Sequence, residues 1–124
     1  MSKYLVDTNI IIDFSRKDRK AAAFLESLEE IIVSIVTVGE IYQGVGNKRE
    51  LESAKQFFRN TKILLIDEQI STLALELLEK YTLPSGLLIL DALIAATAIK
   101  FDLILVTSNV KHFKIIEGLK LKNW

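Results

Sequence analysis

Short runs of consecutive aliphatic residues recur along this chain, and they constrain its fold more than any other feature. The runs are Tyr4–Val6, Ile31–Ile35, Ile63–Ile66 and Leu103–Val106. Strands have this pattern when both faces of their sheet are covered. Segments of helix length separate the runs and carry apolar residues three to four positions apart. The alternation predicts an α/β fold in which helices cover both faces of a parallel sheet.

The expected elements follow from these patterns. We expect strands at 4–6, 31–35, 62–66 and 103–107, and a short fifth strand at 119–121. We expect helices at 9–16, 19–29, 37–45, 48–60, 68–81 and 87–100. No internal repeat, low-complexity tract or Pro/Gly-rich linker interrupts the sequence. The chain is therefore expected to form a single domain, 1–124.

Composition excludes several classes of protein. Half of the 124 residues are apolar, which suffices for a core without a disulfide or metal staple. The 16 basic and 16 acidic residues balance, so nucleic-acid binding would need a local patch. The absence of cysteine excludes thiolate sites. The longest apolar run, 87–99, is shorter than the ~20 residues of a membrane span, so we expect no membrane segment and a cytoplasmic location.

Three acidic residues stand in apolar surroundings. Asp7 directly follows the first expected strand, where it would either cap the next helix or face a ligand at the edge of the sheet. Glu40 ends the pattern Thr37–Glu40, which matches a capping box. Asp91 is expected in mid-helix within 87–98, with no basic residue within helical reach. A buried carboxylate needs a partner, so we expect Asp91 to bind a cation.

Oxygen ligands of this kind suit hard cations such as Mg²⁺, which commonly bridges carboxylates and phosphate. The three acids therefore point to phosphate-ester chemistry. Other polar residues have simpler interpretations. Asp67 is expected to cap a helix, Asp13 to lie at the surface or to support another acid, and the single histidine, His112, is weak evidence for a general base.

Four segments, taken together, resemble the motifs of the PIN domain family, which includes the VapC-type toxins. They are Tyr4–Asn9 with its Asp-Thr-Asn, Val36–Tyr42 with the second acid, Leu90–Ala98 with the third, and Leu105–Phe113. They occur in the order that the family has, and they span almost the whole chain. The resemblance implies a three-layer α/β/α fold with a central parallel sheet of four or five strands.

The resemblance also implies residue roles. Asp7, Glu40 and Asp91 would be the metal-binding acids, with Thr8, Asn9 and Thr107 in support. Many members have a fourth acid where this chain has Asn109, whose carboxamide can coordinate but brings no charge. The implied activity is that of an endoribonuclease using Mg²⁺ or Mn²⁺. Such a protein would be the toxin of a type II toxin-antitoxin pair, which inhibits translation, with a cognate antitoxin and a homodimeric state.

Alternatives remain open at this point. Basic residues at Arg16, Lys17 and Lys111 are candidates for RNA contacts, although exposed charges are commonly just solvated. A catalytically silent PIN-like module that binds RNA or protein would carry the same motifs. A dehalogenase-type phosphatase would need an Asp where Asn9 stands, and a phospho-receiver would use Asp67 and leave Asp91 without a role.

Overall fold

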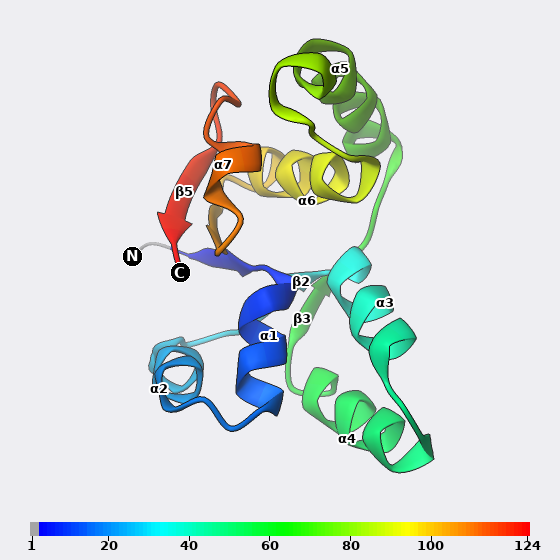
Figure 1. Ribbon diagram of the computed structural model, residues 1–124, viewed down its shortest axis with the longest axis vertical. Coiled ribbons are helices and arrows are strands. Elements are labelled where there is room, and N and C mark those ends of the chain that lie inside the picture. The colour runs from blue at the N-terminus through cyan, green and yellow to red at the C-terminus, as the bar shows by residue number, and fades with distance from the viewer. Residues whose placement is uncertain (1–2) are drawn as a thin grey trace.

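A five-stranded parallel sheet forms the centre of the computed structural model, which describes residues 3–124 (Figure 1). The strand order is β3-β2-β1-β4-β5, and every pairing is parallel. The strands are β1 Tyr4–Val6, β2 Ile32–Ser34, β3 Lys62–Leu64, β4 Ile104–Thr107 and β5 Lys120–Asn123. All five expected strands are present, and the expected parallel sheet is confirmed.

Helices cover both faces of this sheet. They are α1 Thr8–Ser15, α2 Arg19–Ser27, α3 Ile35–Gly44, α4 Lys48–Phe58, α5 Glu68–Ser85, α6 Ile89–Lys100 and α7 Val110–Phe113. In Figure 1, α5, α6 and α7 lie on one side of the sheet, and α1, α2 and α4 lie on the other. The expected three-layer α/β/α architecture is confirmed. No helix within residues 3–124 is both long and apolar enough to cross a membrane.

Each face of the sheet has its own hydrophobic core. Leu5, Ile32 and Leu105 pack with α5 and α6, whereas Val6 and Val106, their neighbours along β1 and β4, pack with α1 and α2. Successive side chains of a strand point to opposite faces. This is why β1 and β4 are apolar on consecutive positions.

The start of α3 differs from the expected one. Ser34 is the N-cap, and its Oγ accepts a hydrogen bond of 3.0 Å from the Val36 N–H. The helix therefore begins at Ile35, and Thr37 is a buried residue inside it. Thr37 and Glu40 do not form a capping box, so that interpretation of Glu40 was wrong.

Two further elements differ from expectation. Helix α6 begins at Ile89, because Leu88 before it has an extended backbone and is the N-cap, and Asp91 therefore lies in the first turn. Helix α5 continues through Pro84 and ends at Gly86, whose φ of 75° is left-handed. The short helix α7 was not expected.

The strand order determines where side chains from distant segments meet. The chain builds β2 and β3 on one side of β1, and β4 and β5 on the other. Neighbouring strands that are followed by connections in opposite directions leave a crevice at their carboxyl ends, where ligands bind in open α/β sheets. Asp7 follows β1 and Thr107 ends β4 at this point.

Candidate metal centre

Asp7 lies between the carboxyl ends of β1 and β4. Its backbone N–H donates to the Val106 carbonyl at 3.0 Å, which continues the ladder of the sheet. Its side chain is only 6% exposed. Oδ1 accepts a hydrogen bond of 2.8 Å from the Thr8 N–H at the start of α1, and Oδ2 accepts one of 2.6 Å from the Thr107 hydroxyl. Asp7 is therefore a helix cap as well as a buried carboxylate at the carboxyl ends of β1 and β4.

Burial raises the pKa of the Asp7 carboxyl above its ordinary value, and the donors on Thr107 and Thr8 oppose this shift. The negative charges of Glu40 and Asp91 raise that pKa further. Glu40 comes from α3 and Asp91 from α6. The structure therefore brings the three acids close enough to one another for their charges to interact.

Glu40 lies beside the start of α1. Its Oε1 accepts a hydrogen bond of 2.6 Å from the Thr8 hydroxyl. Thr8 Oγ1 also lies 3.2 Å from the hydroxyl of buried Thr37. Thr8 thus joins Asp7, which it follows directly, to Glu40.

Asp91 is partly exposed in the first turn of α6, where the helix dipole favours a carboxylate. Its expected mid-helix position was wrong, as was the expectation that this carboxylate is buried. Its Oδ2 lies 3.6 Å from Nδ1 of His112, which α7 brings to α6. Sequence reasoning gave His112 little weight, because only the fold places it beside an acid.

Thr107 and Asn109 link the two ends of the site. Thr107 is fully buried, and its Oγ1 accepts a hydrogen bond of 3.0 Å from the Asn109 N–H while its proton goes to Asp7. Asn109 Nδ2 lies 2.9 Å from His112 Nδ1. A continuous chain of contacts therefore runs from Asp7 through Thr107, Asn109 and His112 to Asp91.

Some predicted site residues lie farther from these acids. Asn9 is exposed on the first turn of α1, and no side-chain hydrogen bond of it appears among residues 3–124. The three basic residues expected to contact RNA are all exposed: Arg16, Lys17 and Lys111. Nothing in the structure tests their role.

Two other acids have structural partners. Asp13 accepts a hydrogen bond of 2.8 Å from the indole N–H of Trp124. Asp67 caps α5 by accepting from the Ile70 N–H at 2.9 Å, as expected. Asp67 also pairs with Lys100, which holds the pKa of its carboxyl below the usual value. This leaves the receiver-type alternative without a free aspartate at this strand end.

The acids fit a divalent cation by their chemistry. Their donor set consists of carboxylate oxygens, which hard cations such as Mg²⁺ and Mn²⁺ prefer. Asp7 is a buried carboxylate whose charge two neighbouring acids oppose. Within residues 3–124, however, no three acidic or histidine side chains stand close enough to ligate one ion together. Like charges repel, and Glu40 and Asp91 instead face Thr8 and His112.

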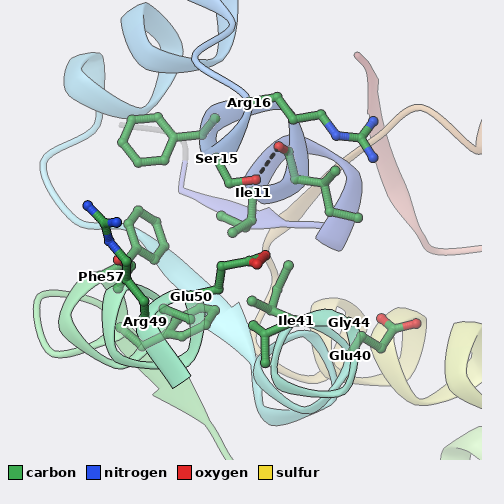
Figure 2. A pocket seen from close by; sticks show the side chains of 15 residues that line it. Ile11, Ser15, Arg16, Glu40, Ile41, Gly44, Arg49, Glu50 and Phe57 are labelled. Carbon is green, nitrogen blue, oxygen red and sulfur yellow. Dashed lines mark hydrogen bonds between the residues drawn. The ribbon is translucent and has the colours of Figure 1, made fainter. Parts of the chain in front are cut away.

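A groove of about 630 Å³ lies between α1, α3 and α4, with Glu40 at its edge (Figure 2). Apolar side chains dominate its wall, among them Ile11, Ile41 and Phe57. Figure 2 shows the Glu50 carboxylate extending into the groove from α4. The groove therefore connects an apolar surface with one acid of the site.

A family model of the PIN domain matches residues 4–118. The chain belongs to the PIN domain family. Ribonuclease VapC19 of Mycobacterium tuberculosis is 36% identical over 121 residues, which cover 94% of this chain and 96% of that relative. Ribonuclease VapC1 of Methanocaldococcus jannaschii is 34% identical over 123 residues, covering 98% and 86%.

Solved structures of PIN proteins confirm the fold. A toxin-antitoxin complex from Klebsiella pneumoniae contains a chain with a TM-score of 0.81 and 30% identity, covering 94% of this chain and 95% of its own. VapBC2 from Rickettsia felis, bound to a DNA fragment from its promoter, gives a TM-score of 0.81 at 29% identity, with 98% of each chain covered. The family resemblance inferred from the four motifs is confirmed.

Proposed function

We propose that this PIN domain is a divalent-metal-dependent endoribonuclease and the toxin of a type II toxin-antitoxin pair. The observation that carries the proposal is the buried Asp7 carboxylate at the carboxyl end of the central strand β1, whose pKa is raised by burial and by the charges of Glu40 and Asp91. Such a cluster is costly unless a cation neutralises it. The ribonuclease names of relatives that match nearly the whole chain support RNA as the substrate.

Asp7, Glu40 and Asp91 would hold Mg²⁺ or Mn²⁺. A cation of this kind, when bound, lowers the pKa of a water and offsets charge on a phosphate. The chain's own residues prepare the ligands. Thr107 holds one oxygen of Asp7, and Thr8 holds one oxygen of Glu40, so both carboxylates are oriented by hydroxyl donors at 2.6 Å. Asn109 stands in place of a fourth acid and adds no negative charge that would repel RNA.

Exposed basic residues would bind the RNA backbone. Arg16 and Lys17 follow α1, and Lys111 lies on α7 next to His112. Each contact between a basic side chain and a phosphate releases counterions, so binding would weaken as salt rises. With a net charge of +0, the chain has no bulk positive charge to attract RNA, so binding would depend on local groups of basic residues such as these.

An antitoxin protein is the proposed partner, since the similar solved structures are toxin-antitoxin complexes. The apolar groove between α1, α3 and α4 is the surface proposed for it, because it buries few polar groups and Glu50 would pair with a basic side chain. Ile41→Asp should abolish antitoxin binding in a pull-down and leave RNA cleavage intact. Antitoxin binding at wild-type affinity would exclude this groove.

We also propose a homodimer. Leu83 is 96% exposed and Leu88 64% exposed, and Ile89 and Leu90 are exposed beside them, where α5 turns into α6. Contiguous exposed apolar side chains mark association surfaces. A second copy would bury them close to Asp91.

The activity is tested by RNA cleavage with purified protein. We expect the wild type to cleave RNA in the presence of Mn²⁺ and not in the presence of EDTA. We expect Asp91→Asn to cleave no RNA under either condition. Asp67→Asn is the matched control, because Asp67 is also an aspartate at a helix start but caps α5 and pairs with Lys100. Binding of RNA without cleavage by the wild type under all conditions would instead support the catalytically silent module. Cleavage by Asp91→Asn at the wild-type rate would overturn the proposed metal centre.

A further inference from the structure

Lys17 has a backbone conformation that lysine rarely adopts. It lies in the turn between α1 and α2 with a φ of 64°, in the left-handed region that favours glycine. The Lys17 N–H donates to the Phe14 carbonyl at 3.0 Å. The Asp18 N–H donates to the Asp13 carbonyl at 3.1 Å, which completes the Schellman pattern of a helix end. A side chain at the glycine position of this pattern costs stability, and strain of this kind points to a function of that side chain.

Trp124 holds this turn from both sides. Its indole N–H donates to Asp13 Oδ2 on α1 at 2.8 Å. On α2, the Phe24 ring packs against the indole with ring centroids 5.5 Å apart, and Lys20 Nζ lies 4.3 Å from the centre of the indole ring. Trp124 is itself fixed, because its backbone N–H donates to the Thr107 carbonyl at 2.9 Å. One residue thus ties both helices that flank the turn to the end of β4.

Asp13 connects Trp124 to the turn. Its carbonyl accepts a hydrogen bond of 3.1 Å from the Arg16 N–H, in addition to the one that closes the turn, while its carboxylate accepts from Trp124. Arg16, which directly precedes Lys17, lines the groove that has Glu40 at its edge (Figure 2). The turn that Trp124 holds therefore borders one acid of the candidate site.

We propose that Trp124 is a positioning residue for the RNA substrate, which holds the turn so that Lys17 meets a phosphate of the RNA backbone. This role rests on the RNA substrate of the proposed function and not on its metal centre. Lys17 is exposed and makes no ion pair among the residues that the structure describes, so its charge is available to a ligand. A turn that is held beforehand loses little backbone freedom when the phosphate binds.

The test is the affinity of the full chain for a fluorescein-labelled single-stranded RNA, measured by anisotropy in EDTA at several salt concentrations. Trp124→Phe keeps an aromatic ring beside α2 but removes the N–H that Asp13 accepts. Loss of one phosphate contact should weaken binding about fivefold at about 0.1 M salt and reduce the salt slope by about 0.7. Thermal melting reports the fold of each variant. A merely structural role would lower the melting temperature and leave the salt slope unchanged.

Two substitutions of Asp13 form a matched pair, because both remove its negative charge. Asp13→Asn keeps an oxygen that can accept from the indole, and it should bind RNA at least as tightly as the wild type. Asp13→Ala keeps no acceptor and should weaken binding about fivefold, although the loss of a negative charge by itself favours RNA. This pair tests the proposal even if Trp124→Phe does not fold.

Lys17→Gly tests the lysine itself. It relieves the backbone strain and removes the charge, so it should melt higher than the wild type and bind RNA about fivefold more weakly. Asp102, with a φ of 53°, is the other non-glycine residue in the left-handed region within residues 3–124. Asp102→Gly is therefore the control and should leave RNA affinity unchanged. In the Lys17→Gly background, Trp124→Phe should weaken RNA binding no further.

Several results would overturn the role of Trp124. They are wild-type affinity and salt slope in Trp124→Phe, equal RNA affinity of Asp13→Ala and Asp13→Asn, and an undiminished effect of Trp124→Phe in the Lys17→Gly background. A Lys17→Gly variant that melts lower than the wild type or binds RNA as tightly would also overturn it, as would an equal loss of affinity in Asp102→Gly. A wild type that binds no RNA would instead overturn the proposed function.

Discussion

The hydroxyl of Thr107 should make a large contribution to stability for a single group. It is fully buried at the end of β4, donates to Asp7 Oδ2 at 2.6 Å, and accepts from the Asn109 N–H at 3.0 Å. Thr107→Val removes this hydroxyl at nearly constant shape. Asp7, which is 6% exposed, then loses one of its two donors with little access to water in exchange.

The size of the effect follows from the two hydrogen bonds. A hydrogen bond to a charged group contributes about 1.5 to 3 kcal/mol and one between neutral groups about 1 kcal/mol. We therefore expect Thr107→Val to lower the free energy of unfolding by about 2 to 4 kcal/mol at neutral pH. For a domain of this size the melting temperature would fall by about 8 to 15 °C.

The loss should depend on pH because Asp7 titrates. Burial raises the pKa of the folded-state Asp7 carboxyl above its ordinary value of 3.8, so its ionisation costs stability above the folded-state pKa and nothing below the unfolded-state value. Without the Thr107 donor the folded-state pKa rises further, and the cost at neutral pH grows. The deficit of Thr107→Val relative to the wild type should therefore shrink as pH falls toward about 4.

Urea unfolding in EDTA, at neutral pH and near pH 4, measures the loss of stability of Thr107→Val and its dependence on pH. Thr107→Ser is the control, because it keeps the hydroxyl and loses one buried methyl group, at a cost of about 1 kcal/mol. Equal stability of Thr107→Val and Thr107→Ser at neutral pH would show that the hydroxyl does not make this contribution. A valine deficit that is the same at both pH values would show that the contribution does not depend on the ionisation of Asp7.

Three further predictions concern the cap of α3, the cation and the dimer. Ser34→Ala should cost about 1 kcal/mol as the loss of a cap, whereas Glu40→Gln in EDTA should melt no lower than the wild type; a lower melting point for Glu40→Gln would show that the charge of Glu40 does not destabilise the metal-free protein. Mg²⁺ at about 100 times its Kd should stabilise the wild type by about 2.7 kcal/mol and Asp91→Asn far less, as measured by melting; equal shifts would mean that Asp91 does not bind it. Sedimentation should show a dimer for the wild type and a monomer for Leu83→Glu/Leu88→Glu, and a wild-type monomer at micromolar concentration would exclude the dimer.

The strands could be predicted because their residues are covered on both faces. Leu5 and Val6 belong to opposite cores, and so do Leu105 and Val106, which makes consecutive apolar residues the mark of a central strand here. The same reasoning placed Asp7 and Thr107 at the carboxyl ends of neighbouring strands. Parallel pairing of β1 with β4 then brings them within hydrogen-bonding distance.

The helix starts were harder to predict, because several residues could serve as caps. Ser34 lies inside an apolar run and was assigned to the strand, whereas Thr37 and Glu40 have the spacing of a capping box. In the structure Ser34 is the cap, and the helix starts at the residue after it. Thr37 is 1% exposed and lies inside α3, so it is not a cap.

The position of His112 could not be predicted from the sequence. It stands on the four-residue helix α7, which is too short to give a periodic pattern. Its contact with Asp91 depends on how α7 packs against α6, which is a matter of tertiary structure. Phe113 on α7 is buried in the core and holds the helix in place. A lone histidine three residues after an asparagine was the only signal available.

The central claim is that Asp7, Glu40 and Asp91 form one cation site, and Mn²⁺ affinity of the purified protein tests it most directly. Calorimetric titration of the wild type should show saturable binding. Asp7→Asn, Glu40→Gln and Asp91→Asn should each weaken it by at least about tenfold, and Asp67→Asn should leave it unchanged. Equal Mn²⁺ affinity in the wild type and all three variants, or no binding by the wild type, would contradict the account.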